Sequence, residues 1–82
     1  MFTYYPEGVC SVMMEVELDG SIIKDAVVTG GCNGNLQGIC RLIKGREVDE
    51  VIDELEGIRC GFKPTSCPDQ LAKALRAAKD AQ

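Results

Sequence analysis

Five cysteines are the residues best suited to chemistry in this 82-residue chain, which contains no histidine. Without histidine, a Ser-His-Asp or Cys-His catalytic set is excluded, and so is any metal site with an imidazole ligand. Thiolates are nucleophiles, and they are soft ligands for zinc and iron–sulfur clusters. The cysteines therefore indicate metal or thiol chemistry, and plain packing remains the alternative for each of them.

Cys32 and Cys67 are the foremost candidates because each stands next to the start of a predicted helix. Cys32 lies in a glycine-rich turn, and Cys67 directly precedes Pro68. Free N–H groups and the helix dipole stabilise a thiolate at such positions. Cys10 begins a predicted strand and Cys60 lies on a predicted loop, and both are candidate third and fourth ligands. The predicted ligands of zinc or an iron–sulfur cluster are thus Cys10, Cys32, Cys60 and Cys67.

The glycine-rich turn at residues 30–35 offers a second kind of site. Backbone N–H groups in such a turn can hold a phosphate, and the candidates here are Gly31, Asn33, Gly34 and Asn35. The turn matches neither the P-loop nor the dinucleotide-binding fingerprint. A purely geometric role for the glycines stays open beside phosphate binding.

The first half of the chain predicts a small antiparallel sheet. Alternating residues predict a half-buried strand over residues 10–18, whose inward face carries Cys10, Val12, Met14, Val16 and Leu18. Asp19-Gly20 predicts a hairpin turn. Residues 21–29 form the return strand, where less regular alternation indicates a bulge. An aromatic segment at residues 2–5 would add a third strand.

The second half predicts three helices, because its apolar residues recur at helical spacing. The first covers residues 35–44, with Cys40 on its apolar stripe, where we expect core packing. The second covers residues 48–55, and the third begins near Pro68 after a loop at residues 58–65. The predicted fold is a single α+β domain over residues 1–82. It has an antiparallel sheet of two or three strands and three helices packed on one face.

Composition narrows the range of partners. The net charge is −4 and no dense basic run occurs, so we expect no binding to duplex nucleic acid. No apolar run approaches the ~20 residues that cross a bilayer. No signal peptide is recognisable, so we expect a cytoplasmic protein with reduced thiols. A domain this small has a limited core, and a homodimer would stabilise it as a metal would.

Residues Thr65-Ser66-Cys67-Pro68-Asp69 resemble the motif that names the TSCPD domain family. The segment 30–39 also looks like the short stand-alone members of that family. The resemblance implies an association with ribonucleotide reductases, in which this domain also occurs, and with nucleotide binding. It does not imply that the chain reduces ribonucleotides alone, because that reaction needs a large barrel and a radical source. An accessory module is what the resemblance supports.

A looser resemblance is to iron–sulfur cluster scaffolds of the IscU/NifU type. Cys10, the Asp19-Gly20 hairpin, Cys32 and Cys67 occur here in the order typical of those scaffolds. This resemblance implies a scaffold-like fold with the three cysteines as ligands. Two positions depart from the pattern, because Val12 replaces an aspartate and Ser66 replaces a histidine.

Three functional hypotheses remain open. The chain is a thiolate module for zinc or an iron–sulfur cluster, or an accessory domain for ribonucleotide reductase or another protein. The third hypothesis is an interaction domain whose cysteines only pack. The sequence indicates no reaction that the chain would catalyse alone.

Overall fold

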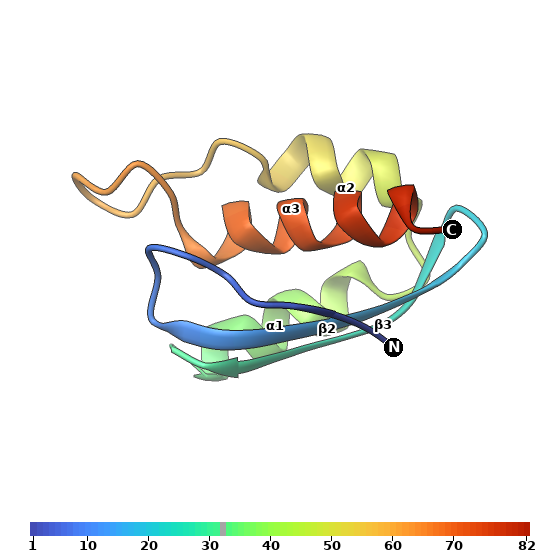
Figure 1. The fold of residues 1–82 in the computed structure, drawn as a ribbon, viewed down its shortest axis with the longest axis horizontal. Helices are drawn as coiled ribbons and strands as arrows, with labels where there is room; N and C mark the ends of the chain where they lie inside the picture. The colour runs from blue at the N-terminus through green and yellow to red at the C-terminus, as the bar shows by residue number, and fades with distance from the viewer. Residues whose placement is uncertain (32) are drawn as a thin grey trace.

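The chain folds into a three-stranded antiparallel sheet followed by three helices (Figure 1). The computed structural model describes residues 1–31 and 33–82. In sheet order the strands are β1 (Phe2–Tyr4), β2 (Ser11–Asp19) and β3 (Ile22–Gly30), and the helices are α1 (Asn33–Ile43), α2 (Val48–Leu55) and α3 (Cys67–Asp80). The predicted α+β class is therefore confirmed, with three strands. No helix in the described part of the chain is long and apolar enough to span a membrane.

A tight hairpin joins β2 to β3 at the predicted turn. Gly20 has a φ of 60° there, a left-handed conformation that glycine adopts without steric cost. Near the turn, Leu18 pairs with Ile23, whereas Glu17, the residue before Leu18, pairs with Asp25. One residue of β3 is therefore unpaired, which confirms the bulge predicted in the return strand.

A second bulge lies at Val12 and changes which side chains face the core. The register shifts between Ser11 and Met13, so that Val12 is 63% exposed while Ser11 is only 3% exposed. Cys10 is exposed as well. The prediction that Cys10 and Val12 face inward was therefore wrong, because one extra residue moves the preceding side chains to the opposite face. The predicted inward alternation is obeyed from Met14 onward.

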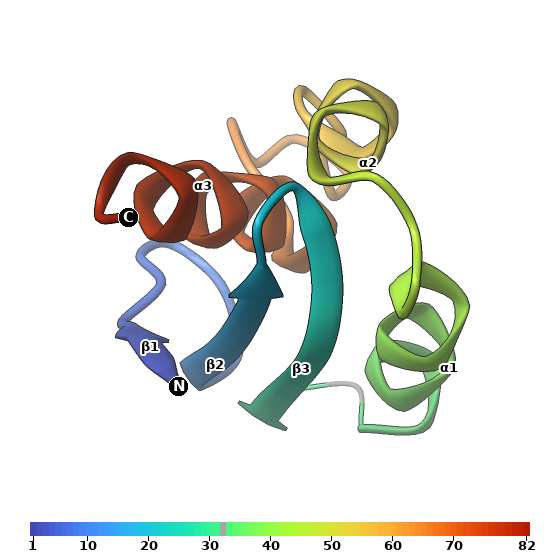
Figure 2. The same cartoon turned by 90° about the vertical axis from the view of Figure 1, so that its right-hand side faces the viewer.

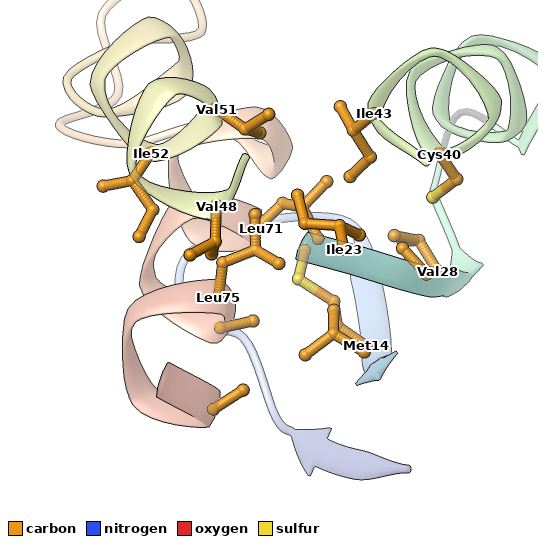
Figure 3. Packing of buried hydrophobic residues seen from close by; sticks show 14 of the residues in the cluster. Met14, Ile23, Val28, Cys40, Ile43, Val48, Val51, Ile52, Leu71 and Leu75 are labelled. Atoms are coloured by element: carbon orange, nitrogen blue, oxygen red, sulfur yellow. The ribbon is translucent and has the colours of Figure 1, made fainter. Parts of the chain in front are cut away.

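One hydrophobic core joins the inner face of the sheet to all three helices (Figure 3). Met14 of β2, Ile23 of β3, and Leu71 and Leu75 of α3 are fully buried in it. The other members of the cluster are Val16, Ala26, Val28, Leu36, Cys40, Ile43, Val48, Val51, Ile52, Ala74 and Ala78. The helices therefore pack on one face of the sheet, as predicted.

Helix α1 lies beside β3, α3 lies over β1 and β2, and α2 packs against α3 (Figure 2). The connection from α1 to α2 also bonds to the edge of β3. The Ile23 N–H donates to the Arg46 carbonyl at 2.9 Å, and the Gly45 N–H donates to the Ile23 carbonyl at 2.8 Å. Cys40 is 5% exposed on α1, and this burial raises the pKa of its thiol. The prediction that Cys40 packs in the core is confirmed.

The core position of Leu71 makes a direct test of this packing. Leu71→Ala would leave a cavity between α3 and the sheet, and we expect the free energy of unfolding to fall by about 2–5 kcal/mol. Urea unfolding followed by circular dichroism measures the change. The matched control is Leu42→Ala, because Leu42 is 75% exposed and its truncation should stay within about 0.5 kcal/mol. Equal losses in both variants would contradict the arrangement of the core.

Candidate functional site: a thiol-lined cleft

Helix α3 begins with a serine cap that also holds the preceding loop. The Asp69 N–H donates to the Ser66 Oγ at 3.2 Å, and the Ser66 hydroxyl donates to the Ile58 carbonyl at 2.6 Å. Pro68 occupies the first turn, where its missing N–H costs no hydrogen bond. Ser66 therefore starts the helix and fixes the loop between α2 and α3.

The side chain of Asp69 is the centre of a buried polar network. It accepts hydrogen bonds from the Gly57 N–H at 2.8 Å and from the Thr65 hydroxyl. The Gln70 amide donates to Thr65 Oγ1 at 2.9 Å and accepts from the backbone N–H of Glu7 at 3.2 Å. The Thr65 hydroxyl, followed by the Gly57 N–H, lowers the pKa of the Asp69 carboxyl. The network ties the amino-terminal segment and the end of α2 to the start of α3.

The polar side chains of residues 65–70 are engaged in these hydrogen bonds, and the reactive group that remains in the segment is the thiol of Cys67. The thiol of Cys67 is half-buried, and its Sγ lies 3.2 Å from the Oγ of Ser11. Ser11 is 3% exposed, so this hydroxyl holds the thiol from within the protein. Cys67 is thus the residue of the segment that is available for chemistry.

A cleft of about 350 Å³ opens beside Cys67. Its lining comes from α1, the segment before β2, the loop before α3, and α3 itself: Cys10, Asn35, Leu36, Ile39, Cys60, Ser66, Cys67 and Pro68. Three of the four predicted metal ligands therefore share one cleft, although Cys10 is far from Cys60 and Cys67 in the sequence. The loop before α3, which contains Cys60, projects at one end of the molecule (Figure 1).

The described thiols of this cleft form no disulfide and are not arranged as a preformed metal site. Cys10, Cys60 and Cys67 form no disulfide. Within residues 1–31 and 33–82, no three Cys, Asp or Glu side chains are grouped closely enough to hold a metal ion. The fourth predicted ligand, Cys32, lies outside the described residues. The described thiols thus share a cleft and would need to move closer together to bind one ion.

The predicted phosphate-binding residues lie between β3 and the first turn of α1. Gly31 has a φ of 69°, and a Cβ there would stand 3.1 Å from the Ser11 nitrogen. Its glycine is therefore required for the close approach of the turn to β2. Asn33 begins α1, Gly34 is exposed, and Asn35 is exposed and also lines the cleft. The helix starts at Asn33 rather than at the predicted Asn35.

Sequence reasoning missed Ser11 as the partner of Cys67. The alternation over residues 10–18 assigns Ser11 to the outer face, and only the bulge at Val12 turns it inward. Bulges have no strict sequence signature. Leu36 and Ile39 were predicted only as apolar helix positions, and they prove to be walls of the cleft.

The Asp69 network predicts a large cost for removing its carboxylate. Asp69→Ala would leave the Gly57 N–H and the Thr65 hydroxyl without their acceptor, and we expect a loss of about 1–3 kcal/mol in unfolding free energy. Urea denaturation measures this loss. The control is Asp53→Ala, an exposed acidic residue of α2, which should be nearly neutral. A neutral effect at Asp69 would show that the network contributes nothing.

The same carboxylate predicts an acid-dependent stability. The pKa of Asp69 is lower in the folded chain than the ordinary value of about 3.9. Its stabilisation is therefore complete above that value and is lost as the pH falls through the folded pKa. We expect Asp69→Asn to flatten the acid part of a stability profile. The profile is measured in about 1 M salt, which screens the exposed pairs of Asp25 and Glu54, whose pKa values are also lowered. An unchanged slope would contradict this assignment.

Exposure predicts the order in which the thiols react. In the folded chain, N-ethylmaleimide should modify Cys10 and Cys60 first, the half-buried Cys67 more slowly, and Cys40 last. Burial blocks access to Cys40 and raises the pKa of its thiol, which lowers the thiolate population. Peptide mass spectrometry over time gives the order, and unfolded protein in urea provides the control in which the differences disappear. Early modification of Cys40 would contradict the packing of α1.

Comparison with models of protein families finds a match that covers nearly the whole chain. The model of the TSCPD domain matches residues 2–79, a range that contains the sheet, α1, α2, the cleft and nearly all of α3. Comparisons with curated proteins and with solved structures find no match, so the IscU/NifU-like fold stays a prediction. The match spans nearly the whole chain and includes the residues 65–69 that build the start of α3. The chain therefore belongs to the TSCPD domain family.

Proposed function

We propose that this TSCPD domain binds a metal centre, zinc or an iron–sulfur cluster, through the cysteine thiolates of the cleft. The observation that carries the proposal is the meeting of Cys10, Cys60 and Cys67 in one cleft. Cys60 and Cys67 are neighbours along the chain, whereas Cys10 lies far from them in the sequence, so local sequence does not explain its meeting with them. Cys32 is the fourth proposed ligand.

The chemistry of the lining favours metal binding over acid–base catalysis. The chain has no histidine, and no carboxylate is among the residues that line the cleft in the described part of the chain. A proton-transferring pair is therefore not supplied there. Thiolates in apolar surroundings suit zinc and iron, which prefer soft sulfur ligands. Leu36 and Ile39 would shield the metal–sulfur bonds from water.

The proposed ligands differ in how firmly the fold holds them. Cys67 is fixed in α3 beside Ser11, whereas Cys10 and Cys60 lie outside helices and strands and are exposed. Cys67 would serve as the anchor, and the segments that carry Cys10 and Cys60 would close toward it. Because the metal would bind the folded chain and not the unfolded one, it would stabilise the fold as well.

A nucleotide-linked accessory role in ribonucleotide reduction is the second candidate. Two observations favour it: Asn35 of α1 lines the cleft, and the first turn of α1 carries no acidic residue. A phosphate at this turn would therefore meet backbone N–H groups without a neighbouring carboxylate on the helix. Gly31, Asn33 and Gly34 would supply the remaining N–H donors in this proposal.

Cobalt provides a direct test of thiolate ligation, because Co²⁺ replaces zinc and gives intense sulfur-to-metal absorption. We expect anaerobic titration of the reduced chain with Co²⁺ to produce this absorption. Cys67→Ser should weaken Co²⁺ binding by at least about tenfold, since it removes the anchoring ligand. Zinc added afterwards should displace the cobalt and abolish the absorption.

The control for this titration is Cys40→Ala, which removes a cysteine that lies in the core and outside the cleft. Circular dichroism confirms that each variant is folded. Absorption that survives Cys67→Ser, or that is lost equally in Cys40→Ala, would contradict the proposed site. No metal binding, combined with a higher melting temperature in the presence of a nucleoside diphosphate, would favour the second candidate instead.

A further inference from the structure

The loop between α2 and α3 presents an aromatic side chain to solvent. Residues 57–66 project beyond the start of α3 (Figure 1). Within this loop Phe62 is 110% exposed relative to a reference residue, and Ile58 is 41% exposed. Isolated exposed apolar residues are common, but a phenylalanine with no burial at all is costly to leave in water. Phe62 therefore calls for a reason beyond the fold of this chain.

The loop is held in place and does not hang free. Its start is fixed by the Gly57 N–H, which donates to Asp69, and its end by Ser66, which donates to the Ile58 carbonyl. Inside the loop, the Cys60 N–H donates to the Thr65 carbonyl at 3.2 Å. A turn is closed where the Lys63 N–H donates to the Cys60 carbonyl at 3.0 Å. Phe62 sits in this turn, so a partner would bind it at a small ordering cost.

The charge of the loop is opposite to that of the chain. The net charge is −4, yet residues 57–66 contain Arg59 and Lys63 and no acidic residue. Five other cations pair with a carboxylate, namely Lys24, Lys44, Arg46, Arg76 and Lys79, whereas Arg41 and Lys73 form no ion pair with a described residue. Arg59 and Lys63 have no such ion pair with any described residue and are exposed. The loop thus combines an exposed aromatic anchor with two uncommitted positive charges.

We propose that residues 58–63 form a docking loop for a protein partner that offers an apolar pocket rimmed by Asp and Glu residues. Phe62 fills the pocket, and Arg59 and Lys63 pair with the acidic rim. Aromatic residues and arginine are the side chains that most often dominate binding energy at interfaces. A loop of this size buries a small area, so the complex is transient and its association is sensitive to salt.

Charge argues for a different protein as the occupant. A symmetric pair of these chains joined through the same loop would bring the cations of both copies together, which opposes association. Nucleic acid would meet a chain that is negative overall. Cys60 belongs both to the loop and to the cleft lining, so the partner would sit at the edge of the cleft. The proposal stands on Phe62 and the cations, and it does not depend on metal binding.

Selection from a random peptide library tests this docking loop without knowledge of the partner. The full-length chain is the bait, and its Phe62→Ser variant is used to remove peptides that bind elsewhere. We expect the enriched peptides to combine Asp or Glu with apolar residues. For the best peptide, fluorescence anisotropy should show a Kd that rises roughly tenfold or more in Phe62→Ser. The double variant Arg59→Glu and Lys63→Glu should weaken binding to a similar extent, and so should added salt.

The matched control is Leu42→Ser, which removes another largely exposed apolar side chain, on α1, and should leave the Kd unchanged. Four results would overturn the proposal. They are the absence of any Phe62-dependent peptide, enrichment of basic peptides, tighter Phe62-dependent binding of an oligothymidylate, and a dimer of the free chain that Phe62→Ser dissociates. The last two would assign the loop to nucleic acid or to a second copy.

Discussion

The buried carboxylate of Asp69 holds together the start of α3 and the loop before it, the segments that carry Cys67 and Cys60. It accepts from the Gly57 N–H and from the Thr65 hydroxyl, so that the two ends of the loop before α3 meet at one side chain. A buried acceptor with its donors in place is stabilising, whereas donors left without it carry a full desolvation cost. Loop, helix start and cleft wall therefore depend on the same interaction.

This dependence explains how the residues at 65–70 divide their roles. Hydrogen bonds engage the polar atoms of Thr65, Ser66 and Gln70 with one another, with Asp69, with the loop and with the amino-terminal segment. Cys67 stands among them with its thiol directed to Ser11 and the cleft. The polar side chains of this segment therefore build the start of α3, and the Cys67 sulfur is the atom of the segment that faces the cleft.

Local sequence was sufficient for the elements, because periodicity and turn residues act within a few positions. The hairpin at Gly20, the burial of Cys40 and the three helices follow from such signals. The start of β2 was mispredicted, since the bulge at Val12 is set by pairing with β3 and not by the residues beside it. The contact of Ser11 with Cys67 depends on that bulge and joins residues distant in the chain. Neither could be derived from spacing alone.

The sequence led to the hypothesis that the cysteines meet. Among the described residues, three of them share a cleft, but they are not close enough together to hold a metal ion. Cys67 is held by α3 and Ser11, whereas Cys60 lies in a loop that Asp69 and Ser66 hold at its ends and that two backbone hydrogen bonds of Cys60 hold in its middle. Residues 57–64 are exposed, so a movement of this loop as one unit would break few buried contacts and would leave its neighbours folded. Cys60 and Phe62 share that middle. A partner bound to Phe62 and a ligand bound to Cys60 would therefore act on the same segment, and each would change the binding free energy of the other.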